Sequence, residues 1–88
     1  MKADVARISQ DLKSKLQQNP GAVVRLIVHL QGDPSSRVAA VEAHGLTVRY
    51  TYSLISAMAV EGSGSASLAL AEESWVISVE EDKTVHTM

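Results

Sequence analysis

The sequence contains no cysteine at all. This absence excludes disulfide bonds, iron–sulfur clusters and cysteine-based zinc sites. The remaining candidate metal ligands are histidines at 29, 44 and 86, and none has a second histidine or an acid at metal-ligand spacing on the same expected element. We therefore expect no metal and no cofactor, and we interpret His29 as an ordinary surface or interface histidine.

Large aromatic side chains are also scarce, because the 88 residues include no Phe, one Trp and two Tyr. The core must therefore be aliphatic. A chain of this length fits one domain and buries only about 60 % of its unfolded surface on folding. We expect marginal stability and some dependence on a partner.

The chain has neither a strong net charge nor a long apolar run. Its formal net charge of -2 disfavours nucleic acid as a partner, because nucleic acid binds clustered basic surfaces. No apolar run approaches the roughly 20 residues that a membrane-spanning helix needs. The N-terminal MKADVARISQ lacks the apolar segment of a signal peptide, so we expect any such segment to have been removed or never present.

The first expected element is a helix from Ala3 to Gln18, ended by Asn19-Pro20-Gly21 because proline lacks the amide that a helix needs. One narrow apolar stripe runs along it: Val5, Ile8, Leu12 and Leu16. Such a stripe must lie on this domain or on a neighbour.

Four strands and two further helices are expected after this helix. The strands are Val23–Leu30, Leu46–Tyr52, Ile55–Val60 and Trp75–Glu80, which are rich in β-branched residues or alternate in polarity. One helix begins at Asp33-Pro34 and ends at His44-Gly45, a capped start and a glycine stop. The other runs from about Ser65 to Glu73, after a flexible link from Gly62 to Ser65.

This order, β-α-β-β-α-β, predicts an α+β fold: a ferredoxin-like four-stranded antiparallel sheet with two helices on one face, plus the N-terminal helix. We divide the chain into an N-terminal helical extension (1–21), a domain (22–82) and an extended C-terminal tail (83–88). In the second strand we expect Leu46, Val48, Tyr50 and Tyr52 on the buried face, and in the fourth Trp75, Ile77 and Val79.

The other face of the sheet is expected to stay uncovered, and either solvent or a partner meets it. Its expected residues are Ile27, Thr47, Arg49, Ser78 and Glu80. An RNA-binding sheet of this kind carries aromatic residues on this face, and the alternation places none there.

Motifs for catalysis are missing from the sequence. GSGSAS from Gly62 has serine where a dinucleotide fingerprint needs its last glycine, and no serine has the flanking glycines of a nucleophile elbow. The acids Glu72-Glu73 and Glu80-Glu81-Asp82 are sequence neighbours, and neighbours on a strand point to opposite faces and do not converge on a substrate. We expect the protein not to be an enzyme.

The C-terminal stretch VISVEEDKTVHTM, from Val76 to Met88, carries a family likeness. It combines a strand, Glu-Glu-Asp and a six-residue tail with His third from its end. Together with VVRLIVHL, a helix ending in HG, VRYTYSLISAMAV and the element order, it resembles the propeptides of subtilisin-type serine proteases, the inhibitor I9 family. The likeness covers about Val23 to Met88, and the leading helix lies outside it.

The resemblance implies a tight competitive inhibitor of a secreted protease that also helps the catalytic domain to fold. In relatives the uncovered sheet face packs on two parallel protease helices, and acids matching Glu80 and Asp82 approach the N-termini of those helices, whose first amides lack partners. The tail lies in the substrate cleft as an added strand. Met88 then fills the primary specificity pocket, Val85 fills a second apolar pocket, and His86 and Thr87 add backbone bonds.

Other interpretations of the same residues stay open. By itself the acidic triplet is an exposed turn, and the tail is a frayed terminus. A free-standing subtilisin inhibitor of the same fold is the close alternative to a propeptide within the resemblance. From another class, a ferredoxin-like regulatory or small-ligand module fits the fold but needs a polar pocket, and a metal-transfer domain fails for want of cysteine.

Overall fold

The computed structural model describes residues 7–52 and 54–82. In chain order the elements are β1 (Arg7–Ile8), α1 (Gln10–Gln18), β2 (Val23–Leu30), the 3₁₀ turn η1 (Pro34–Arg37), α2 (Val38–Ala43), β3 (Thr47–Tyr52), β4 (Ala57–Ser63), α3 (Gly64–Leu70) and β5 (Val76–Glu81). Residues 1–6 and 83–88 lie outside this description, so the expected tail and the Val5 end of the apolar stripe lie outside it too.

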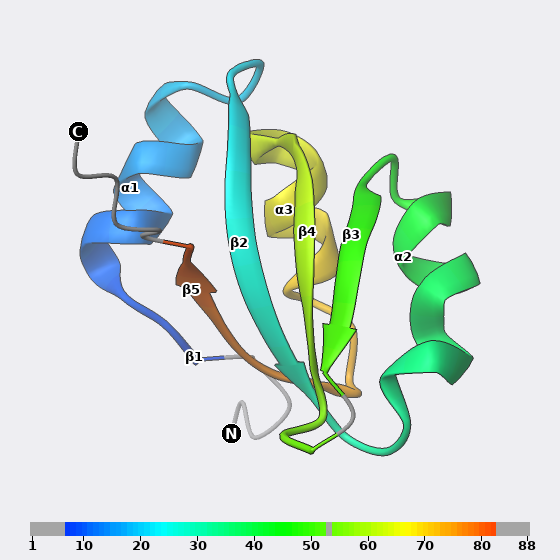
Figure 1. Ribbon diagram of the computed structural model, residues 1–88. Helices are drawn as coiled ribbons and strands as arrows, with labels where there is room; N and C mark the ends of the chain where they lie inside the picture. The colour runs from blue at the N-terminus through cyan, green and yellow to red at the C-terminus, as the bar shows by residue number, and fades with distance from the viewer. Residues whose placement is uncertain (1–6, 53, 83–88) are drawn as a thin grey trace, which may run out of the picture.

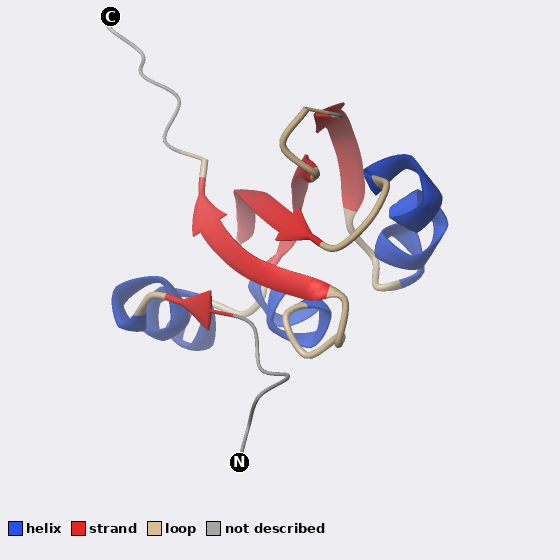
Figure 2. Ribbon diagram, turned by 90° about the horizontal axis from the view of Figure 1, so that it is seen from below, coloured by secondary structure: helices blue, strands red, loops and turns tan. Residues whose placement is uncertain are grey.

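The sheet has the strand order β1-β5-β2-β4-β3. β5, β2, β4 and β3 pair antiparallel, and the short β1 adds to the outer edge of β5 in parallel. The helices α1, α3 and α2 lie on one side of this twisted sheet, with α3 behind β2 and β4 in Figure 1 and all three on the same side in Figure 2. The predicted α+β fold, a ferredoxin-like antiparallel sheet covered on one face, is confirmed.

The core lies between the sheet and the helices and is mainly aliphatic, as expected, although Trp75 also belongs to it. Its fully buried members include Leu16, Leu26, Val28, Leu30, Val41, Met58, Val60 and Leu70. Leu12 and Leu16 of α1 belong to the same cluster as the sheet residues. The apolar stripe of the first helix therefore lies on this domain.

Helix α1 begins later than predicted. Ser9 is its N-cap, and the Ser9 hydroxyl accepts a hydrogen bond from the Leu12 amide at 3.1 Å. Ile8 lies before this cap, in β1, where it pairs with Val79. The predicted start at Ala3 was wrong. The Ser9 side chain satisfies an amide that has no partner within the helix, so the helix starts after Ser9, although the apolar spacing continues before it.

The stretch around Gly62 is regular structure, and the prediction of a flexible link there was wrong. β4 continues to Ser63, and α3 begins at the next residue with Ser63 as its cap. Both glycines sit where a side chain would collide: a Cβ would lie 2.4 Å from Leu46 Cδ2 at Gly62, and 2.8 Å from the Leu16 carbonyl oxygen at Gly64. These glycines allow close packing, and Gly64 lets α3 approach α1.

A β-bulge in β3 reverses the predicted faces of its second half. Val48 pairs with Val60 on the helix side, but the next paired residue is Tyr50, opposite Ala59. The extra residue, Arg49, shifts the alternation by one position. Tyr50 and Tyr52 therefore lie on the helix-free face, and the prediction that they share the covered face with Val48 was wrong.

A second bulge, in β5, likewise changes which residues of the predicted fourth strand face the core. Val76 pairs with Leu30 and Ser78 with His29, which leaves Ile77 between them without a partner on β2. Val76 is buried, and Ile77, which was predicted to point inward, is 46 % exposed. After the bulge Val79 is buried as predicted.

Candidate functional site

The helix-free side of the sheet, which we call the open face, is made of three cross-strand rows. One row is Glu80–Ile27–Ala59–Tyr50, the next is Ser78–His29–Ala57–Tyr52, and the third is Arg25–Glu61–Thr47. Ile27, Thr47, Ser78 and Glu80 lie where the sequence predicted them. The described elements leave this face uncovered, because all the helices pack on the other side (Figures 1 and 2).

Two tyrosines form the aromatic part of the open face. Tyr50 is 59 % exposed, and its ring meets that of Tyr52 edge to face, with centroids 4.7 Å apart and planes at 66°. This geometry is favourable for an aromatic pair and holds both rings in place. Alternation in the sequence had placed both tyrosines on the buried face, and no aromatic residue was expected here. The open face does carry aromatic residues, so that argument against RNA binding no longer holds. The net charge of -2 still disfavours RNA as a partner.

The charged end of the open face surrounds Glu61. The Arg49 Nη1 donates to Glu61 Oε1 at 2.8 Å, and the Arg25 Nε lies 3.9 Å from the same oxygen. Both arginine side chains are about half exposed, so solvent screens these pairs strongly. The bulge residue Arg49 thereby joins β3 to β4 through its side chain.

The acids at the end of β5 divide between the two faces. Glu80 lies opposite Ile27 on the open face, and its side chain is 64 % exposed. The Glu80 Oε2 contacts the His29 Nε2 at 2.8 Å, which fixes the carboxylate but leaves most of it in solvent. Glu81 lies opposite the buried Leu26, on the helix side.

Asp82 continues the strand pairing beyond the end of β5. Its amide donates to the Arg25 carbonyl oxygen at 3.0 Å. Because side chains alternate along a strand, Asp82 shares the open face with Glu80. The structure therefore brings together two of the sequence-predicted site residues. The other four, Val85, His86, Thr87 and Met88, lie outside the described residues.

The other histidine of the described chain has a structural contact. The Nε2 of His44, at the end of α2, meets the Oε2 of Glu73 at 2.7 Å and joins the helix to the turn after α3. Across residues 7–52 and 54–82 no three histidine or acidic side chains are grouped so that they could hold a metal ion. None of the helices in these ranges is both long and apolar enough to cross a membrane.

Comparison with known proteins gives no match: no protein-family model fits the chain, and no characterised protein matches its sequence.

The open face combines apolar and acidic groups at separate places. It presents an aromatic pair on one edge strand, small alanines at its centre and two acids at the opposite edge. Sheet geometry places Tyr50 and Glu80 three strand spacings apart, or about 14 Å. A surface with an apolar contact at one end and unpaired amide donors at the other complements this arrangement.

Proposed function

We propose that this chain is the propeptide of a subtilisin-like serine protease, acting as a tight competitive inhibitor and as an intramolecular chaperone for the catalytic domain. On this proposal it is exported as part of a protease precursor. The proposal rests on the resemblance of Val23 to Met88 to such propeptides and on the geometry at the end of β5.

The observation that carries the proposal is the position of Glu80 and Asp82. Both acids lie on the uncovered side of the sheet, where a partner that packs on the open face meets them. Each carboxylate then accepts hydrogen bonds from the first amides of a protease helix, which have no partners within the helix. Tyr50 and Ile27 supply apolar area to the same contact, in the same row as Glu80.

The residues after Asp82 complete the inhibitor. β5 leads directly into them, so a partner bound to the open face lies within reach of the chain that follows. Lys83–Met88 then add as a strand to the substrate cleft, with Val85 and Met88 in its two apolar pockets. Each apolar side chain buried in this way contributes about 1.5–3 kcal/mol.

The test is steady-state inhibition of a panel of subtilisin-type proteases by the full 88-residue chain. We expect competitive inhibition in the nanomolar range or below for at least one member, and an increased refolding yield when the same chain is added to its denatured catalytic domain. A chain that inhibits without aiding refolding is the free-standing inhibitor of the same fold. A chain that inhibits no member of the panel contradicts the proposal.

A further inference from the structure

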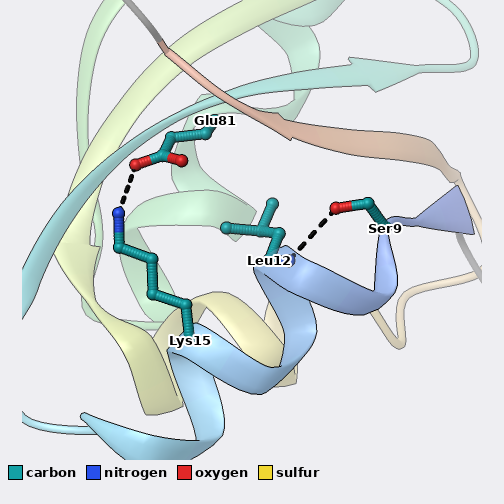
Figure 3. A network of polar contacts seen from close by, with 4 residues as sticks. All are labelled: Ser9, Leu12, Lys15 and Glu81. Atoms are coloured by element: carbon teal, nitrogen blue, oxygen red, sulfur yellow. Dashed lines mark hydrogen bonds and ion pairs between the residues drawn. The ribbon is translucent and has the colours of Figure 1, made fainter.

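Helix α1 contacts the end of β5 through the long side chain of Lys15. Lys15, in the last turn of α1, points its Nζ at the Glu81 Oε2, across the space between the helix and the strand (Figure 3). Glu81 is the one acid of the Glu80-Glu81-Asp82 triplet that faces the helix side, and its side chain is only 31 % exposed. A carboxylate so placed has lost part of its hydration, and the Lys15 ammonium compensates for part of that loss.

The base of Lys15 is held rigidly. Its neighbour Leu16 is fully buried and Leu12 is 5 % exposed, while the Ser9 hydroxyl caps the first turn of the helix (Figure 3). The close approach at Gly64 fixes α1 against α3. The turn of α1 that carries Lys15 is therefore packed in the core, and only the outer part of the lysine side chain extends away from it.

The N-terminal segment follows the outer side of β5 step by step. β1 pairs with Ser78 and Val79, and Lys15 then binds Glu81, two residues further on. On the inner side, β2 pairs with the strand as far as Asp82. Two surface depressions, of about 360 and 290 Å³, lie beside the ion pair, and Lys15 and Glu81 line both of them. The ion pair therefore links the helix to the strand across the space between them.

We propose that α1 braces the end of β5, with Lys15 as a positioning residue that fixes the direction in which the chain leaves the sheet at Asp82. This inference rests on the proposed function, since the braced strand end is the one that carries Glu80 and Asp82 to the partner. The brace reduces the conformational freedom that is lost on binding, so it increases affinity without touching the partner.

Two readouts test the brace on the full chain: hydrogen exchange of the Asp82 amide, which needs no protease, and the inhibition constant. Lys15→Met should raise the Asp82 exchange rate and weaken inhibition, each roughly two- to fivefold, the range of a partly exposed ion pair. Lys15→Glu should raise the Asp82 exchange rate and weaken inhibition further, because two carboxylates then meet. Lys15→Glu combined with Glu81→Lys should return both readouts toward their wild-type values. The matched control is Lys13→Met, since Lys13 is exposed on the same helix and forms no ion pair with the described residues.

The outcomes separate this inference from the proposed function. If the wild-type chain inhibits and Lys15→Met changes neither readout, or changes both no more than Lys13→Met does, the brace is wrong and the inhibitor stands. If the wild-type chain inhibits no protease, the proposed function is wrong, and Asp82 exchange alone decides whether α1 holds the strand end. Failure of the charge-reversed pair to recover protection at Asp82 also overturns the brace.

Discussion

Removing the two acids of the open face should weaken inhibition without unfolding the domain. The combined variant Glu80→Ala and Asp82→Ala removes both carboxylates that the proposed function sets against the protease. A carboxylate near a helix N-terminus contributes about 0.3–1 kcal/mol, and one that caps the helix contributes about 1 kcal/mol. Together they amount to about 1–2 kcal/mol, so the inhibition constant should rise roughly 5- to 30-fold.

The structure also sets the expected cost to the free protein. Glu80 loses its contact with His29, but the Glu80 side chain is 64 % exposed, so the pair contributes at most about 1 kcal/mol. Thermal melting of each variant measures this term, and inhibition is then compared at a temperature where all variants are folded. Glu72→Ala is the matched control, because Glu72 is an exposed acid in the turn after α3, on the helix side of the molecule.

The assay is the inhibition constant at low and at high salt. The difference between wild type and the double variant should shrink as ionic strength rises, because salt screens the attraction between an exposed carboxylate and a helix N-terminus. An inhibition constant within twofold of wild type at low salt, with the variant folded, refutes the capping role of these acids.

Two further predictions concern the aromatic pair and the packing of α1. Tyr50→Ser should weaken inhibition about tenfold or more, as expected where a contact buries a large aromatic side chain. Leu54→Ser, at a residue 97 % exposed beyond β3, should not weaken it, and equal losses in the two variants would show that the open face has no special role. Gly64→Ala should lower the free energy of unfolding by about 1–3 kcal/mol, because the added Cβ would lie 2.8 Å from the Leu16 carbonyl oxygen. Gly21→Ala is the control, since a Cβ there meets nothing within 4 Å. Thermal melting measures both variants, and an unchanged midpoint for Gly64→Ala would contradict the close packing of α1 on α3.

The element order was predictable because local signals mark the boundaries. Asp33 accepts a hydrogen bond from the Ser35 amide and Pro34 begins the next turn, as its sequence indicated. Gly45 ends α2 with φ +93°, a conformation that glycine adopts without strain. Such signals act over a few residues, so they are legible without knowledge of the tertiary contacts.

The bulges were not predictable from alternation. Tyr50 and Tyr52 have strand-forming side chains that suit either face, and only the register against β4 decides which face they take. Arg49 gives no local signal of the bulge, because its charge also fits an exposed position in an unbroken alternation. The same limit applied to Ile77, since the shift against β2 depends on contacts distant in sequence.

The glycines of the EGSGS stretch, Gly62 and Gly64, led to the prediction of a flexible link where the structure is regular. Their composition resembles a flexible linker, yet other parts of the chain approach both closely: the Leu46 side chain at Gly62, and the backbone of α1 at Gly64. The face taken by the acids at the end of β5 was easier to predict. No bulge interrupts the strand from Glu80 to Asp82, so simple alternation places these two acids on the same face. Their role as helix caps stays a prediction.

The most direct test of the inhibitor is deletion of Val85–Met88 from the full chain, measured as the inhibition constant against a subtilisin-type protease that the full chain inhibits. If Val85 and Met88 fill the two apolar pockets of the cleft, as the proposed function requires, their burial contributes about 3–6 kcal/mol in total. The shortened chain should then bind roughly 100-fold or more weakly. Equal inhibition by the shortened and the full chains would contradict the account.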